Sequence, residues 1–126
     1  MTLKASSFDR ALDYKVISQD DVKATINVNA ADGPCVLHSI VIDNVGGGAA
    51  CYAKISDGYT ASIGASSPQL VLECATGVRQ FYSFPDGVEF YKSLNFWVTS
   101  NADPQGTAAP NLASNANTIK INLLVS

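Results

Sequence analysis

The stretch CVLHSIVIDNVGGGAACYAKISDG, residues 35–58, decides the fold that the sequence predicts. It begins with an apolar run, passes through a glycine-rich break at residues 44–48, and continues as a second alternating run up to Asp57 and Gly58. Because glycine adopts positive φ without a Cβ clash, the chain can fold back at the break. The pattern therefore predicts two paired strands joined by a glycine turn.

Alternation assigns two faces to this predicted strand pair. In the first strand one face holds Val36, His38, Ile40 and Ile42, and the other holds Leu37, Ser39, Val41 and Asp43. In the second strand the inward residues are Cys51, Ala53 and Ile55, opposite Tyr52, Lys54 and Ser56. An apolar sheet face needs a second sheet to cover it, so the stretch predicts a sandwich.

The rest of the chain repeats short alternating runs separated by turn residues. Further strands are predicted at residues 22–30, 70–74, 78–84, 88–100 and 118–126, with loops at residues 59–69 and 101–117. The inward residues of the last strand are Ile119, Ile121, Leu123 and Val125, and the Pro85-Asp86-Gly87 sequence predicts a turn. Residues 1–21 are interpreted as an arm, as a segment with a short strand at residues 14–18, or as partly disordered.

This spacing is typical of an all-β protein, a single antiparallel β-sandwich or jelly roll of about seven to eight strands. Residues 1–21 are interpreted as an N-terminal arm or edge segment and residues 22–126 as the sandwich domain. A chain of 126 residues is long enough for one such core.

Charge and hydropathy exclude several classes of partner. The formal net charge is −3 and the eight Lys and Arg residues are scattered, whereas a nucleic-acid surface needs clustered basic residues. No apolar run approaches the roughly 20 residues of a membrane helix. The first residues lack the apolar segment of a secretory signal, which predicts a protein that is not exported by that route.

The cysteines and the single histidine argue against a metal or cofactor. Cys35, Cys51 and Cys74 are odd in number and form no CxxC pair, which favours buried reduced thiols over disulfides. They and His38 show no metal-ligand spacing, so we expect neither a metal nor a cofactor.

No motif in the sequence indicates catalysis. His38 is the obvious general base at neutral pH, but its apolar neighbours favour a packed or hydrogen-bonded core histidine, and no Gly-x-Ser-x-Gly motif supplies a nucleophile. Residues 46–48 lack the Lys and Ser or Thr of a phosphate-binding loop. Asp43, Asp57 and Asp86 lack calcium-loop spacing and are interpreted as turn caps. We therefore expect a protein without catalytic residues.

Two aromatic residues suggest a binding surface instead. Tyr52 and Trp97 fall on strand faces opposite the predicted core, and Val41 and Val71 add apolar surface on outward faces. Exposed aromatic side chains anchor protein interfaces, and they also form platforms on which sugars stack. The low content of charged residues, 15%, favours the protein interface.

Three segments carry a resemblance to a known group of proteins. They are LHSIVIDN with AACYAKISDG, then SSPQLVLECATGVRQFYSFPDGVEF, then LNFWVTSNADPQGTAAPN leading to INLLVS. In this order they resemble small β-sandwich structural proteins of tailed bacteriophages, especially phages of cyanobacterial and marine hosts. The similarity covers residues 36–126, and the three cysteines depart from the pattern.

The resemblance implies a non-enzymatic virion component, most simply a capsid decoration or cement protein held by protein–protein contacts. The alternative that it implies is a tail, fibre or receptor-binding module that recognises host carbohydrate. Partners would then be other virion proteins and further copies of the chain, and a trimer suits three-fold positions of a capsid. Neither a nucleic acid nor a membrane is expected as a partner.

Overall fold

The computed structural model describes residues 14–22, 26–110, 112 and 118–126. The strands are β1 (Lys15–Gln19), β2 (Cys35–Asp43), β3 (Cys51–Asp57), β4 (Leu70–Cys74), β5 (Arg79–Phe90), β6 (Leu94–Thr99) and β7 (Lys120–Val125). The described part of the chain contains no helix, so the predicted all-β class is confirmed. Consequently no helix found there could cross a membrane.

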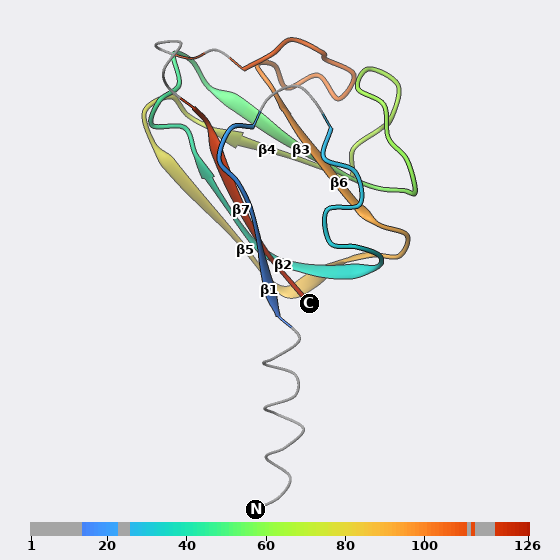
Figure 1. Cartoon of the computed structure of the whole chain (residues 1–126). Coiled ribbons are helices and arrows are strands. Elements are labelled where there is room, and N and C mark those ends of the chain that lie inside the picture. The colour runs from blue at the N-terminus through green and yellow to red at the C-terminus, as the bar shows by residue number, and fades with distance from the viewer. Residues whose placement is uncertain (1–13, 23–25, 111, 113–117) are drawn as a thin grey trace, which may run out of the picture.

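The strands form two antiparallel sheets that face each other. One sheet has the order β1-β7-β2-β5 and the other has the order β4-β3-β6. Figure 1 shows the sheets as two layers, with β7 running between β1 and β2. The predicted antiparallel, sandwich-like architecture is therefore confirmed.

The core lies between the sheets and consists of alternate residues from both. The predicted inward residues at the end of the chain, Ile119, Ile121, Leu123 and Val125, are all fully buried. The inward residues predicted for β3, Cys51, Ala53 and Ile55, are also fully buried. Strict alternation was thus sufficient to identify the core face of these two strands.

The predicted pairing of the first two strands is wrong, because β2 and β3 belong to different sheets. Residues 44–50 cross from one sheet to the other instead of forming a hairpin turn. The Asn44 side chain holds this connection, since its Nδ2 donates to the carbonyl of Ala49 at 3.0 Å and to that of Cys74 at 3.2 Å. In opposing sheets the apolar faces of β2 and β3 can cover each other, which a flat hairpin does not allow.

A bulge reverses the predicted faces in the first half of β2. Leu37 pairs with Val125 of β7 while Ser39 pairs with Leu124, so His38 is an extra residue in β2. One extra residue shifts the alternation by one position. As a result Leu37 is fully buried, whereas His38, predicted to point inward, is only half-buried.

The Pro85-Asp86-Gly87 sequence forms a bulge rather than the predicted turn. β5 continues through it, and residues 84–87 lie opposite His38 of β2. Gly87 has a φ of 76°, and a Cβ atom there would lie 2.4 Å from Cγ1 of Val36. The position therefore requires glycine, as the turn signal implies, but the chain continues in the same strand.

The strand predicted at residues 22–30 is reduced to a single bridge in its described part, and residues 23–25 lie outside the described residues. Asn27 exchanges two backbone hydrogen bonds with Phe96 of β6, at 2.9 and 3.0 Å. Val28, predicted to point inward, is 46% exposed, and Asn29 has a φ of 53°. The chain turns away after Asn27, so this segment covers only part of the β6 edge.

The N-terminal segment contributes an edge strand to the four-stranded sheet. The short strand predicted at residues 14–18 is observed as β1, which pairs with β7 from Lys15 opposite Val125 to Gln19 opposite Ile121, while residues 1–13 lie outside the described residues. Ile17 packs against the core, while Val16 points outward.

Candidate functional site

The four residues predicted to form an interface lie on opposite outer faces of the sandwich. Tyr52, Val71 and Trp97 are on the three-stranded sheet, on the side away from the core. Val41 is on the outer face of the four-stranded sheet, between two buried isoleucines. One partner surface cannot cover both faces, so these residues do not form a single site.

The predicted exposure of Trp97 is wrong, because its side chain is fully buried. It lies beside Lys54, its cross-strand partner, which is buried as well. The Lys54 ammonium group donates to the carbonyl oxygens of Asp103 and Gly106, so residues 100–110 cover this face. Burial lowers the pKa of Lys54, against a smaller opposing effect of the Asp103 carboxylate.

The loop at residues 100–110 contains backbone hydrogen bonds of its own. Ser100 donates its backbone N–H to Ala108 at 3.0 Å, and Gly106 donates to Asp103 at 2.8 Å. In the same sheet, the indole Nε1 of Trp97 is buried without a hydrogen-bond partner among the described residues. Burial of Trp97 therefore leaves its donor unpaired.

The opposite outer face, on the four-stranded sheet, carries an apolar band. We define the outer apolar band as Val16, Leu124, Val41 and Phe81, one residue from each of the four strands. Val16 pairs with Leu124, and Val41 pairs with Phe81. Val16 is 65% exposed and Phe81 59% exposed, while the two central residues are half-buried. The two pairs lie in neighbouring rows of the sheet, because Leu124 pairs with Ser39 and Val41 pairs with Asn122, so the band runs diagonally from β1 to β5.

Only Val41 of this band was predicted from the sequence. Leu124 is the one apolar residue among the three outward residues of β7, which also include Lys120 and Asn122. The outward position of Phe81 follows from Tyr82, its neighbour, which packs against the core. Alternation therefore indicates that both side chains point outward. Only the strand order shows that they lie on the same face of one sheet.

His38 lies near one end of the band and contacts two residues from distant parts of the chain. Its ring centroid is 5.0 Å from that of Tyr14, and its Nε2 is 2.7 Å from Oγ of Ser126. The predicted hydrogen-bonded histidine is confirmed, but its predicted place in the core is wrong. A hydrogen-bonded serine and histidine are two of the three members of a catalytic triad. Within the described residues, however, no carboxylate contacts the His38 ring to orient it.

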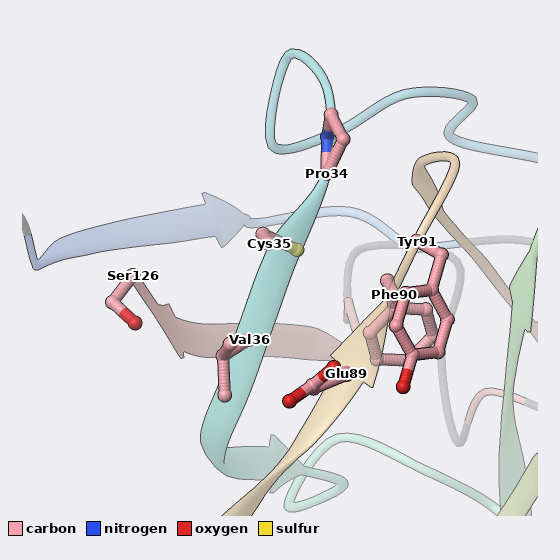
Figure 2. Close-up of a pocket in the computed structure, with 7 residues that line it drawn as sticks. All are labelled: Pro34, Cys35, Val36, Glu89, Phe90, Tyr91 and Ser126. Atoms are coloured by element: carbon pink, nitrogen blue, oxygen red, sulfur yellow. The ribbon is translucent and has the colours of Figure 1, made fainter.

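A shallow pocket of about 300 Å³ opens beside this pair. It is lined by Pro34, Cys35, Val36, Glu89, Phe90, Tyr91 and Ser126, and Figure 2 shows the Tyr91 ring next to the Glu89 carboxylate. A hydrogen bond to Glu89 raises the pKa of Tyr91, whose side chain is 74% exposed. The pocket thus combines an exposed aromatic ring, a carboxylate and a hydroxyl group with apolar lining residues.

Asp57 and Asp43 act as structural caps, as the sequence predicted. The Asp57 carboxylate accepts backbone N–H groups from Tyr91 and Lys92 at 2.9 Å and from Ser93 at 3.3 Å. Burial acts to raise the pKa of Asp57, but these three hydrogen bonds outweigh it and hold the pKa below its usual value. The turn between β5 and β6 is therefore fastened to the end of β3.

Asp43 is held at the end of β2 by a different set of contacts. It accepts the backbone N–H of Val45 at 3.1 Å and forms an ion pair with Arg79 at 3.0 Å. These contacts outweigh burial, so the pKa of Asp43 also lies below its usual value.

The three cysteines are free and buried. Cys51 lies on the core face as predicted, and Cys74 in β4 and Cys35 in β2 are also buried, as expected for buried thiols. No group of three or more His, Cys, Asp or Glu side chains in the described ranges is placed to hold a metal ion.

Comparison of the chain with protein-family models, with curated proteins and with solved structures gave no match.

Proposed function

We propose that this protein is a non-enzymatic structural component of a tailed-phage virion, a capsid decoration or cement protein that acts through protein–protein contacts. The observation that carries the proposal is the outer apolar band, which leaves Val16 and Phe81 uncovered on a four-stranded sheet. Contiguous apolar surface on a folded domain usually marks a partner site. The band gives such a partner one face of the sheet to pack against.

The strand order supports a finer description of the fold, a jelly roll. In an eight-stranded jelly roll the first, eighth, third and sixth strands form one sheet, and the second, seventh, fourth and fifth form the other. The observed orders β1-β7-β2-β5 and β4-β3-β6 fit this scheme if the second strand is reduced to the bridge between Asn27 and Phe96. Jelly rolls are common in viral capsid proteins and in lectins, so the fold is compatible with both functions inferred from the sequence.

The proposed partners are further copies of the chain and other virion proteins, with a closed trimer as the simplest assembly. A closed cyclic oligomer covers the same patch on every copy and leaves no open end. Val16 and Phe81, at the two outer strands of the sheet, are the band residues with the most surface left to bury.

Reassociation with virus particles from which the protein has been removed tests the virion role. We expect the unmodified chain to rebind, and the double variant Val16→Ser, Phe81→Ser to bind at least about tenfold more weakly, because it loses two apolar anchors. Val45→Ser is the matched control, since Val45 is 60% exposed but lies in the connection between the sheets. An unmodified chain that does not rebind would contradict the proposal, as would equal loss in both variants.

The pocket beside Tyr91 favours carbohydrate recognition as a second candidate function. Sugars stack on exposed aromatic rings and hydrogen-bond to carboxylates and hydroxyl groups, and Tyr91, Glu89 and Ser126 provide these three features. A glycan array probed with the unmodified chain, Tyr91→Ala and the control Tyr59→Ala tests it. Tyr59 is equally exposed, at 74%, but does not line the pocket. Binding that is lost only with Tyr91→Ala would support this function, and no binding to any glycan would reject it.

A further inference from the structure

Two of the buried cysteines face each other across neighbouring strands. Cys51 of β3 and Cys74 of β4 are direct partners in the antiparallel register. Both side chains point into the core and neither has exposed surface. Directly opposed residues in antiparallel strands have Cα atoms about 4.5–5.5 Å apart, which is inside the range of about 4.4–6.8 Å found in disulfides.

The two thiols are also close enough for each to shift the pKa of the other. Burial raises the pKa of Cys51 to about 12, and a hydrogen bond from its thiol to the Cys74 sulfur contributes to that increase. Burial also raises the pKa of Cys74, while accepting this hydrogen bond acts to lower it. Both groups are therefore protonated thiols in the folded protein, and Cys74 is the better placed of the two to become a thiolate.

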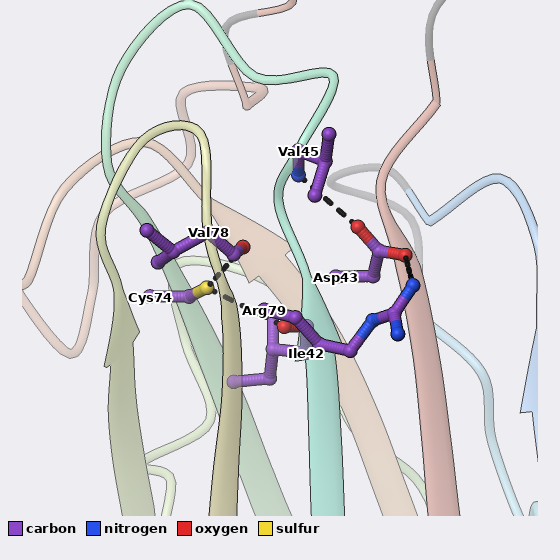
Figure 3. A network of polar contacts seen from close by, with 6 residues as sticks. All are labelled: Ile42, Asp43, Val45, Cys74, Val78 and Arg79. Atoms are coloured by element: carbon purple, nitrogen blue, oxygen red, sulfur yellow. Dashed lines mark hydrogen bonds and ion pairs between the residues drawn. The ribbon is translucent and has the colours of Figure 1, made fainter.

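Cys74 has polar surroundings that Cys51 lacks. Its Sγ lies 3.4 Å from the carbonyl oxygen of Ile42 and 3.4 Å from that of Val78, as Figure 3 shows. These carbonyls come from β2 in the other sheet and from the turn before β5. The contacts fix the position of the Cys74 sulfur at the place where the two sheets meet.

We propose that Cys51 and Cys74 form a latent dithiol site that a small-molecule disulfide, such as oxidised glutathione, converts into a cross-strand disulfide bridge. The inference is independent of the virion role. It identifies a site of covalent modification in the fold and distinguishes this pair from Cys35, which lies in the other sheet and pairs with Phe90.

The reaction proceeds by two thiol–disulfide exchanges. The Cys74 thiol loses its proton to solvent, and its thiolate attacks one sulfur of the small disulfide, which releases one small thiolate. The Cys51 thiolate then attacks the Cys74 sulfur of the mixed disulfide and releases the second. The protein loses two hydrogens and two electrons, and the small disulfide is reduced to two thiols.

Burial of both sulfurs makes access the limiting step. Among the described strands β4 pairs only with β3, at the edge of its sheet, so it can separate locally without unfolding the four-stranded sheet. Oxidant then reaches the pair only while β4 is open. Once formed, the bridge ties β4 to β3 and opposes further opening.

The experiment uses the full chain carrying Cys35→Ala, so that Cys51 and Cys74 are its only thiols. The protein is incubated with oxidised glutathione in a urea concentration below the unfolding transition, and its disulfides are identified by mass spectrometry of peptides. We expect a bridge between Cys51 and Cys74 with a loss of two hydrogens. The variant Cys35→Ala, Cys51→Ala should instead retain a glutathione adduct on Cys74.

Hydrogen exchange provides a second readout that does not depend on how fast oxidation occurs. In the bridged protein, amide exchange in β4 should slow by about tenfold or more relative to the reduced protein, because local opening is restricted. Exchange in β1, the edge strand of the other sheet, should not change. A protein that accumulates only glutathione adducts, or stays reduced while β4 amides exchange freely, would overturn the proposal.

Discussion

The two outer faces of the sandwich differ in what covers them. On the three-stranded sheet, Trp97 and Lys54 are both fully buried, and the loop carbonyls of Asp103 and Gly106 accept hydrogen bonds from Lys54. On the four-stranded sheet, Val16 and Phe81 remain more than half exposed. The chain itself therefore covers the first face around Trp97 and Lys54, whereas Val16 and Phe81 on the second face are open to solvent.

This difference shows that a strand's outward residues need not be surface residues. Alternation reports which side chains share a face, and it correctly separates Trp97 from Phe96 and Val98. It contains no information on whether a distant loop folds over the second face. An aromatic residue on the closed face acts as packing, whereas one on the open face is a candidate anchor.

The largest expected contrast between the faces comes from truncating one aromatic residue on each. Trp97→Ala should lower the free energy of unfolding by about 3–5 kcal/mol, because it leaves a cavity at a fully buried position. Phe81→Ala should change it by no more than about 0.5 kcal/mol, as expected for an exposed side chain. Urea unfolding of the two variants measures both, and similar losses would show that the faces are not different.

A smaller contrast is expected from a pair of asparagines. Asn95 is fully buried, with its Oδ1 accepting from Asn29 N–H at 2.9 Å and its Nδ2 donating to Gly58 at 2.9 Å. Asn95→Ala should therefore cost about 1–3 kcal/mol, because those backbone groups lose their partner. Asn122 is exposed on the open face, so Asn122→Ala should cost about 0.5 kcal/mol or less. Equal values in urea unfolding would contradict this difference in burial.

The smallest effect concerns acid stability. The folded protein holds the pKa of Asp57 below that of the unfolded chain, about 3.9. Its contribution is therefore complete at higher pH and is lost as pH falls through the unfolded and then the folded pKa. Asp57→Asn should reduce the loss of stability between neutral pH and about pH 3. Asp43→Asn is the comparison on the four-stranded sheet, and urea midpoints across this range measure both variants.

The sequence predicted the regular parts of this fold and missed its irregular ones. The last strand was placed correctly because Ile119 to Val125 alternate without interruption and all the inward residues are buried. The faces of β2 were missed at His38, since nothing in the composition marks an inserted residue. The Pro85-Asp86-Gly87 sequence correctly indicated an unusual backbone conformation at Gly87. Because a bulge and a turn both accommodate a positive φ there, the sequence did not distinguish between them.

The candidate site was predictable only in fragments. Val41 was recognised, but its partners in the outer apolar band come from β1, β5 and β7, and only the strand order brings them together. The pocket beside Tyr91 likewise combines the ends of β2, β5 and β7, which are far apart in the sequence. Non-local pairing of this kind cannot be read from local periodicity.

Sedimentation velocity of the purified chain at micromolar concentration tests most directly whether the open face is an assembly surface. We predict a stable oligomer, most simply a trimer, which the double variant Val16→Ser, Phe81→Ser converts to a folded monomer. The Val45→Ser control should sediment like the unmodified chain. A stable monomer of the unmodified chain, with Val16 and Phe81 still in contact with solvent, would contradict self-assembly through the outer apolar band.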